Sequence, residues 1–458
     1  MSTTQDQSRN NPGLQTSSAS AISSDTTATT SSTGSQQKPK KINEFQDGRQ
    51  KPVYTWTQSW KDWFKQSWSS DYDDAKIESR LLSQLSFFPE SDGKRRASII
   101  NTDIGNNQYI HELYIENLEK DPNPSVCKEF VLIHGYAASL GLFIDNFDQL
   151  SSIPGCKIHA IDLLGFGLSS RPKFPQLPAK TKSDIYKVED WFIDSLETWR
   201  LKRNIKRFVL MGHSFGGYLS CAYALKYNQQ TNKGFTSNII DKLVLISPVG
   251  VETSKFSLLD NSKTEPKISI EQEMLADQED IVEGKPIEEA PKSRGRKVFD
   301  YMWEHNYSPF AIIRNSGPVK SKMISRWTTH RFAHVYYQNE KNFQNMHDYI
   351  YRVFNGKGSG EYAITRILSV GALAKLPLID RCPQKFVDMN LPTLWLYGDK
   401  DWMNDEAGLE MTNEINKISR EKHLKNLASF KIIKNAGHHL YLDNPPQFAR
   451  AIFKFLGY

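Results

Sequence analysis

The 458-residue sequence lacks long hydrophobic runs and is poor in cysteine. No apolar run approaches the ~18 residues that a transmembrane helix needs, so we expect a soluble or peripherally bound protein. The cysteines are scattered and show no spacing typical of a metal site. This predicts reduced thiols in a reducing compartment, with no bound metal or other cofactor. The four cysteines are Cys127, Cys156, Cys221 and Cys382.

Residues 1–45 have few large apolar side chains and are rich in Ser, Thr, Gln and Asn. Such a segment cannot bury enough surface to fold, and we expect it to be disordered. It is also a weak mitochondrial presequence, because Arg9 is its one arginine and it carries Asp6 and Asp25. The formal net charge of the chain is +6, which suits solubility and also an anionic membrane surface.

Residues 53–90 form a tryptophan-rich segment with a helical, amphipathic pattern, in which Lys61 and Lys65 lie between aromatic residues. A stripe of this kind either packs on the domain or lies in a membrane interface, where the amphipathic tryptophan ring is favoured. The neighbouring lysines favour the membrane interpretation, with Trp56, Trp60 and Trp63 as the predicted contacts. The aromatic residues at helical spacing are Trp56, Trp60, Trp63, Phe64 and Trp68.

Short, wholly apolar runs farther along the chain indicate strands that are buried on both faces of a parallel sheet. Helical patterns separate these runs, and the alternation predicts the α/β class with a doubly wound, mostly parallel sheet. The sheet domain is expected in two parts, residues 105–251 and 383–458. The predicted strands are residues 108–115, 130–133, 158–161, 208–211, 243–246, 394–397 and 430–433.

The alternation stops in residues 252–382. Up to about residue 296 this segment is highly charged with few large apolar groups, which predicts a flexible surface insertion. From there on the pattern is helical, aromatic and basic. Helices inserted between two strands of a sheet form a cap over the strand ends, where α/β sheets bind ligands.

The motif Gly212-His213-Ser214-Phe215-Gly216 follows one of the apolar runs and precedes a helical pattern. The pattern G-x-S-x-G places a serine on a turn so tight that its neighbours must be nearly free of side chain. The turn exposes Ser214 Oγ at the top of the sheet, and the following helix directs its N-terminus toward developing negative charge. We therefore predict Ser214 as a nucleophile.

A serine nucleophile needs a base, and the base needs an acid that orients it. In this architecture the acid and then the base follow the serine along the chain. The turn after residues 394–397 offers Asp401, with Asp399 as the alternative that hydrogen-bonds within the turn. The loop after residues 430–433 offers His438, which follows a glycine, with His439 as the alternative. Histidines in helical surroundings, such as His334, are interpreted as structural.

An oxyanion hole requires two backbone N–H donors near the nucleophile. The first predicted donor is Phe215, which directly follows the serine. The second comes from the loop His134-Gly135-Tyr136-Ala137 after the first core strand. We predict the N–H group of Tyr136, with Ala137 as the alternative.

Together these motifs resemble the α/β-hydrolase family over residues 126–251 and 383–458, in the family's order. A narrower resemblance is to the lipid-acting branch that includes mammalian α/β-hydrolase-domain proteins 4 and 5. Within that branch the chain looks most like the fungal members, which include a mitochondrial cardiolipin-specific deacylase and relatives described as lysophosphatidic acid acyltransferases. The segments that carry the narrower resemblance are DLLGFGLSSRP (162–172), HGYAAS (134–139), ISPVGVE (246–252), GDKDWM (398–403) and LDNP (442–445).

The resemblance implies phospholipid acyl chemistry, and three functions are consistent with it. The first is a serine phospholipid deacylase that removes an acyl chain, with cardiolipin as the implied substrate. The second is an acyl-CoA-dependent acyltransferase acting on lysophosphatidic acid or another lysophospholipid. The third is a noncatalytic adaptor at a lipid surface, against which the intact Ser214 argues.

His438 and Asp443 also form the spacing H-x-x-x-x-D, which in this family is associated with acyltransferase activity. The competing interpretation is structural, because Asp443-Asn444-Pro445 is typical of a helix start.

The expected partners are an anionic phospholipid substrate and a membrane surface, with no nucleic acid. The resemblance implies the matrix side of the mitochondrial inner membrane, whereas the weak presequence leaves the cytoplasm or a lipid-droplet surface as the alternative.

Overall fold

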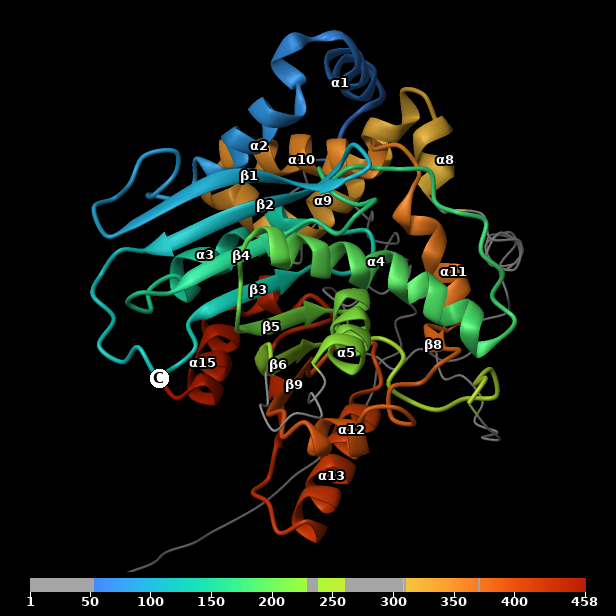
Figure 1. Cartoon of the computed structure of the whole chain (residues 1–458). Coiled ribbons are helices and arrows are strands. Elements are labelled where there is room, and N and C mark those ends of the chain that lie inside the picture. Colours follow the sequence, from blue (N-terminus) through green and yellow to red (C-terminus); the bar gives the residue numbers. More distant parts are fainter. Residues whose placement is uncertain (1–52, 229–237, 260–307, 309, 370) are drawn as a thin grey trace, which may run out of the picture.

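The computed structural model describes residues 53–228, 238–259, 308, 310–369 and 371–458. The N-terminal segment predicted to be disordered lies outside this part of the chain, as does most of the charged insertion. Figure 1 shows a central twisted sheet with helices on both sides and a helical cap beside one edge. In the described part of the chain, no helix is both long enough and apolar enough to cross a membrane.

The central sheet has eight strands in the order β1-β2-β4-β3-β5-β6-β9-β10. From β4 to β10 all neighbours are parallel, whereas β1 pairs antiparallel with β2 and β2 pairs antiparallel with β4. This confirms the predicted α/β class and the mostly parallel, doubly wound sheet. The strands are β1 Arg95–Gly105, β2 Gln108–Asn117, β3 Glu129–Ile133, β4 Lys157–Ile161, β5 Phe208–His213, β6 Ile240–Ile246, β9 Thr393–Gly398 and β10 Ala428–Ile433.

The sheet begins earlier than the predicted boundary at residue 105, because β1 is an additional edge strand that starts at Arg95. It forms a hairpin with β2 through Asn106 and Asn107, both at a φ of 55°. Asparagine tolerates this left-handed conformation better than most residues, which is why it is common in hairpin turns. β1 mixes exposed and half-buried residues, so it lacks the continuous apolar run that marked the inner strands.

Alternate side chains of the inner strands point to opposite faces of the sheet. On one face Val131 and Leu210 pack against α4 (Lys182–Lys202) and α5 (Phe215–Tyr227). On the other face the apolar layer lies under α3 (Ile144–Leu150) and α15 (Pro445–Leu456). Because both faces are covered, the inner strands are apolar throughout. The carboxyl end of this sheet carries the residues described below.

The cap consists of α8 (Phe310–Asn315), α9 (Val319–Gln338), α10 (Glu340–Asn355) and the short α11 (Ile364–Ile367). Its apolar residues join the core beneath α3, and the hydroxyl of Tyr349 accepts a hydrogen bond from Gly141 N–H at 3.3 Å. The N-terminal helices α1 (Trp56–Trp68) and α2 (Asp74–Leu82) pack on α9 and α10. In Figure 1, α1 lies at the top of the molecule, beyond α2 and α10. The tryptophan-rich segment is therefore the outer layer of the cap.

Candidate active site

Ser214 occupies the sharp turn between β5 and α5, with φ 53° and ψ −117°. This is a strained conformation for a residue with a side chain, and it is held by the packing of the flanking glycines. A Cβ on Gly212 would lie 2.3 Å from Ser220 Oγ, and one on Gly216 would lie 2.3 Å from the carbonyl oxygen of His134. Since neither position has room for a side chain, G-x-S-x-G is a steric requirement of this turn.

His438 and Asp401, the predicted base and acid, are neighbours in the structure. Nδ1 of His438 lies 3.3 Å from Oδ1 of Asp401. The carboxylate of Asp401 also accepts hydrogen bonds from the N–H groups of Met403 at 3.0 Å and Gly398 at 3.4 Å. This fixes the acid at the end of β9 in an orientation that suits a proton on His438 Nδ1. The Nε2 atom is then the basic one, as a general base for Ser214 requires.

The two alternative residues have other partners. Asp399 accepts a hydrogen bond from Ala436 N–H at 3.0 Å, and this bond lowers the pKa of Asp399 although its burial opposes the shift. His439 packs against the rings of His213 and Tyr441. Burial holds the pKa of His439 well below the usual range, and the nearby Arg331 adds to this effect. The geometry thus favours Asp401 over Asp399 and His438 over His439.

The loop predicted to supply an oxyanion donor lies directly against the nucleophile. A Cβ on Gly135 would lie 3.0 Å from Cβ of Ser214 and 2.9 Å from Nδ1 of His213. Phe215 is the first residue of α5, and N–H groups of a first helical turn have no acceptor within their own helix. The loop and the helix start therefore meet at Ser214, while the roles of the Tyr136 and Phe215 N–H groups stay predictions.

Two residues of the site carried no signal strong enough for us to assign them a role from the sequence. Oγ of Ser247 lies 2.8 Å from Nδ1 of His438, nearer than Asp401 does. Nε2 of His213 donates to the carbonyl oxygen of His438 at 3.0 Å, since a carbonyl oxygen can only accept, and burial holds the pKa of His213 well below its usual range. Both residues stand at the carboxyl end of a strand, β6 or β5, which is where polar residues of α/β sites gather.

Asp443 has a structural environment. Its Oδ2 accepts a hydrogen bond from Gly437 N–H at 2.9 Å, and its Oδ1 pairs with Arg331 of α9 at 3.0 Å. Arg331 also donates to the carbonyl oxygen of His439 at 3.2 Å. A helix does start here, but its N-terminal cap is Asn444, followed by Pro445. The contacts of Asp443 therefore join the histidine loop to the cap.

The site is closed in this conformation. Ser214 is 4% exposed and His438 is 2% exposed. The cap residue Arg331 binds the loop that carries His438, so the cap is joined to the loop of the predicted base.

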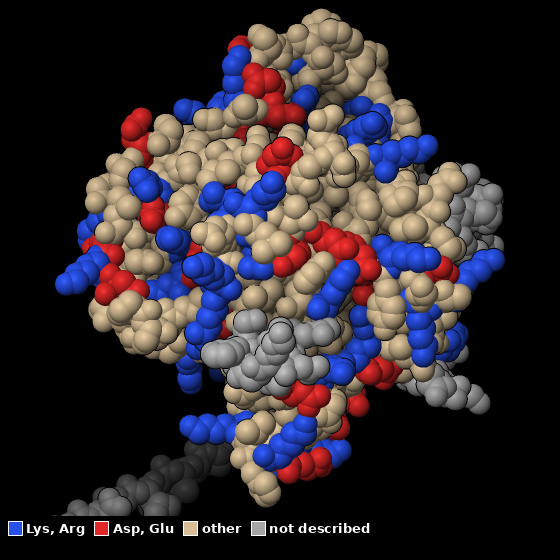
Figure 2. All heavy atoms as spheres, viewed as in Figure 1, with Lys and Arg blue, Asp and Glu red and all other residues tan. Residues whose placement is uncertain are grey.

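The predicted membrane helix α1 buries its polar face and exposes its aromatic face, whereas an ordinary surface helix does the reverse. Its buried residues are polar, namely Ser59, Asp62 and Gln66. Trp63 is half-buried between Trp60 and Trp68, in edge-to-face contact with both rings. Figure 2 shows uncharged atoms over the top of the molecule, where Figure 1 places α1. The large hydrophobic residues of α1 that are more than half exposed are Trp56, Trp60, Phe64 and Trp68.

Residues 129–445 match the model of a family described as alpha/beta hydrolase fold. The chain therefore belongs to the α/β-hydrolase fold family, which confirms the family predicted from its motifs. A 1-acylglycerol-3-phosphate O-acyltransferase of Arabidopsis thaliana is 32% identical over 348 residues, which cover 75% of this chain and 69% of that protein.

Two further relatives are named for lipid acyl chemistry, in keeping with the lipid-acting branch. The 1-acylglycerol-3-phosphate O-acyltransferase ICT1 of Saccharomyces cerevisiae is 30% identical and covers 72% of this chain and 82% of its own length. A (lyso)-N-acylphosphatidylethanolamine lipase of Homo sapiens is 27% identical and covers 69% of this chain and 75% of its own length.

Proposed function

We propose that the protein is a serine enzyme that transfers the acyl chain of a glycerophospholipid, with Ser214 as nucleophile. The observation that carries this proposal is the turn of Ser214 at the end of β5 together with the oriented pair of His438 and Asp401, since His438 contacts His213, the residue before the serine. Ser214 Oγ attacks the ester carbonyl carbon while His438 Nε2 takes the hydroxyl proton. The protonated His438 then delivers that proton to the leaving alcohol, which leaves an acyl group on Ser214.

A fluorophosphonate probe tests the nucleophile, because it reacts covalently with activated serines. We expect the full-length protein to be labelled at Ser214, and the labelling to be lost in Ser214→Ala and strongly reduced in His438→Ala. Ser220→Ala is the matched control, since Ser220 lies in the same helix-start region but hydrogen-bonds to the backbone of Gly216. A wild-type protein that stays unlabelled in the presence of lipid vesicles would favour the noncatalytic adaptor.

For the substrate we propose an anionic phospholipid, with cardiolipin as the leading candidate from the fungal resemblance. The names of the relatives support a phospholipid or lysophospholipid, and the basic residues beside the aromatic face of α1 support a negative head group. Liposomes of cardiolipin, phosphatidylglycerol and phosphatidylcholine, each with the same acyl chains, test the head-group preference by release of free fatty acid. Equal rates on all three would refute the cardiolipin specificity and leave the acyl chemistry intact.

Deacylation and acyl transfer differ in the molecule that accepts the acyl group from Ser214. In a deacylase, water attacks the acyl-enzyme with His438 as base. In a transferase, the hydroxyl of a lysophospholipid attacks instead, and acyl-CoA is the acyl donor that loads Ser214. The acyltransferase names of the plant and yeast relatives support the second reaction as an alternative. Radiolabelled acyl-CoA with lysophosphatidic acid, compared with labelled phospholipid alone, shows which product requires Ser214.

We also propose that the exposed face of α1 inserts into the lipid interface. Partly exposed Lys322 lies 4.6 Å from the centre of the Trp56 ring, so a cation adjoins the aromatic face. Trp60→Ala with Trp68→Ala is expected to abolish sedimentation with cardiolipin vesicles. Tyr186→Ala with Leu201→Ala removes two exposed apolar side chains from α4 and serves as the control.

The compartment of that membrane stays a prediction from the resemblance. Fractionation of cells that express the tagged protein tests this prediction.

A further inference from the structure

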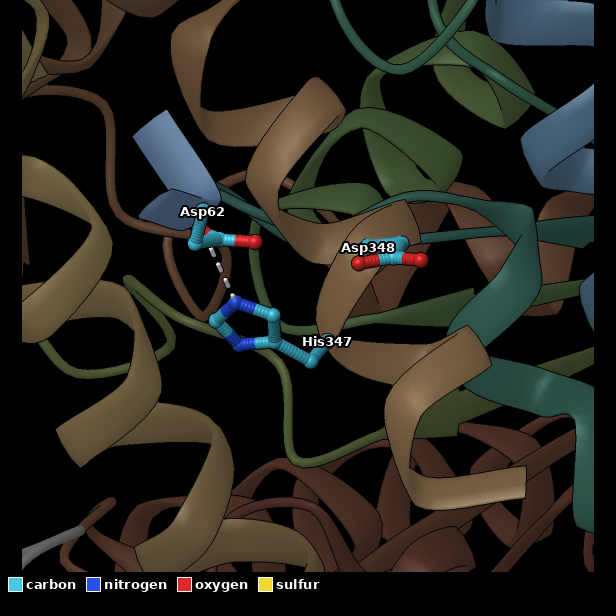
Figure 3. Close-up of side chains that lie close together, drawn as sticks. All are labelled: Asp62, His347 and Asp348. Carbon is cyan, nitrogen blue, oxygen red and sulfur yellow. Dashed lines mark hydrogen bonds and ion pairs between the residues drawn. The ribbon is translucent and has the colours of Figure 1, made fainter. Parts of the chain in front are cut away.

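A cluster of ionisable side chains lies buried beneath α1, on the side of that helix opposite the exposed tryptophans. Asp62 belongs to α1, whereas His347 and Asp348 are consecutive residues of α10. Each offers one ligand atom, and these atoms lie within 4.8 Å of one another. Figure 3 shows the two carboxylates turned toward the space beside the imidazole ring. All three residues are buried, so the cluster is shielded from solvent.

The charge of this cluster is incompletely balanced. Arg80 lies 3.7 Å from Asp348, and among the described residues it is the one arginine or lysine that pairs with either carboxylate. Asp62 has one polar contact among the described residues, to Nε2 of His347 at 3.4 Å. Two buried carboxylates and one arginine leave one negative charge to be neutralised, since burying an unpaired charge is costly. Either a proton or a metal ion provides that positive charge.

A second observation concerns Gln66, the neighbouring polar residue on the buried face of α1. Its amide nitrogen donates to Asp348 at 3.0 Å, so the amide group lies at the cluster. Its carbonyl oxygen is buried and has no hydrogen-bond partner within the described ranges, and the residue is 3% exposed. Nδ1 of His347 is also buried and has no hydrogen-bond partner among the described residues. Buried oxygen and nitrogen acceptors without partners are uncommon and call for an explanation.

We propose that Asp62, His347 and Asp348 bind a divalent transition-metal ion of the zinc type, which fastens α1 to α10. Zinc–oxygen and zinc–nitrogen bonds of about 2.0–2.2 Å place two ligand atoms of a tetrahedral ion roughly 3.4 Å apart. The separation between Asp62 and His347 has this value. The oxygen of Asp348 completes a three-residue set after a small movement, and the carbonyl oxygen of Gln66 or a water supplies the fourth ligand.

The types of ligand atom indicate which class of metal ion would bind. One imidazole and two carboxylates suit zinc and its first-row neighbours. Calcium requires six to eight oxygen ligands and magnesium a nearly ideal octahedron, which these residues do not supply. Asp62 and His347 are 285 positions apart in the chain, so the cluster has no spacing that sequence reasoning recognises and the sequence predicts no metal. The ion would hold the tryptophan-rich helix α1 in place, and it would take no part in the reaction at Ser214.

Metal binding by the full-length protein tests the site without any measurement of acyl transfer. After treatment with EDTA and dialysis against Zn²⁺, the wild type is expected to retain about one more zinc per chain than Asp62→Asn or His347→Gln. With Co²⁺ it is expected to show visible d–d absorption that both variants lose. Asp71→Asn, which removes an exposed carboxylate after α1, is the matched control and is expected to behave as wild type. Equal zinc retention in wild type and Asp62→Asn would overturn the proposal.

A second measurement covers the case in which a variant fails to fold. Zn²⁺ is expected to raise the Tm of the wild type, and EDTA to reverse the increase, because a ligand that binds the folded state stabilises it. A wild-type Tm that does not respond to Zn²⁺ between pH 6 and pH 8 would also overturn the proposal.

Discussion

Ser247 contacts the imidazole of His438 at the nitrogen that faces the predicted acid, with its Oγ 2.8 Å from Nδ1. The same nitrogen lies 3.3 Å from Asp401. A single Nδ1–H group therefore has two oxygen atoms to choose from, and the serine is the nearer one. Ser247 also has a φ of 44°, a conformation that is strained for a residue with a side chain. Strain that places a hydroxyl on the predicted base indicates a positioning role.

We predict that Ser247→Ala lowers kcat roughly 3- to 10-fold, because one hydrogen bond contributes about 1 kcal/mol. KM is expected to change little, since Ser247 acts on the base rather than on the substrate. Steady-state hydrolysis of a short-chain nitrophenyl ester measures both constants. Ser247→Gly is the control, because glycine also removes the hydroxyl but relieves the backbone strain. A normal kcat in Ser247→Gly, with a low one in Ser247→Ala, would attribute the effect to the backbone.

The ion pair between Arg331 and Asp443 yields a prediction about the H-x-x-x-x-D spacing. Arg331 is buried whereas Asp443 is exposed, so Asp443→Asn removes one partner of a buried cation, and we expect a loss of about 1 kcal/mol in the free energy of unfolding. Arg331→Gln is expected to have a similar effect. Both variants should lose deacylation and acyl-CoA-dependent transfer in parallel, as urea unfolding and the two assays would show. Selective loss of transfer in a stable Asp443→Asn protein would instead assign Asp443 to transferase chemistry.

Gly135 supplies a third prediction, about the loop beside the nucleophile. A methyl group at this position would lie 2.9 Å from His213 and 3.0 Å from Ser214, so the loop must shift. We expect Gly135→Ala to reduce kcat/KM about 100-fold, because misplacement by 1 Å near reacting groups has an effect of this size. The Tm is expected to change by only a few degrees. Gly93→Ala is a control from an open turn with nothing near its Cβ, although its positive φ adds some strain. Unchanged activity in Gly135→Ala would show that the loop has no part in catalysis.

The parts of the fold that the sequence predicted are those in which a single physical signal dominates. Residues 208–211 are apolar throughout because both faces of β5 are covered, and the observed strand is Phe208–His213. Glycine at 212 and 216 has a steric reason, so the turn of Ser214 was predictable from five residues. Chain order and places directly after strands pointed to Asp401 and His438, which the structure makes neighbours, while their catalytic roles stay predictions.

The remaining features depend on contacts that no local pattern encodes. β1 lies at the edge of the sheet, where exposed positions carry charged residues, and its run of mixed character gave no strand signal. The helix α1 was predicted from the spacing of its tryptophans, but amphipathic helices usually bury their apolar face. Here the polar face is buried, because Asp62 and Gln66 find partners on α10. Ser247 is one serine among many in the sequence until the fold places it beside His438.

The buried pair of His159 and Glu112 provides a prediction about pH and stability, far from the nucleophile. Nδ1 of His159 lies 2.6 Å from Glu112, whose carboxylate also accepts from Trp199 at 3.0 Å. Burial opposes the charged form of His159, but Glu112 and Glu129 outweigh this effect and raise the pKa of His159. A histidine with a raised pKa in the folded state contributes its full stability below the unfolded value of about 6.5. That contribution is lost as the pH rises through the folded-state pKa.

We therefore expect His159→Gln to cost about 3 kcal/mol of unfolding free energy at pH 6, in the range for a broken buried ion pair. The cost should shrink as the pH rises through the raised pKa of His159. Urea unfolding at several pH values measures the difference between wild type and variant. His423→Gln changes an exposed histidine after α13 (Asp405–Glu421) and controls for the general effect of pH. A cost that rises from pH 6 to pH 9 would mean that His159 is neutral in the folded protein and that its pKa is lowered rather than raised.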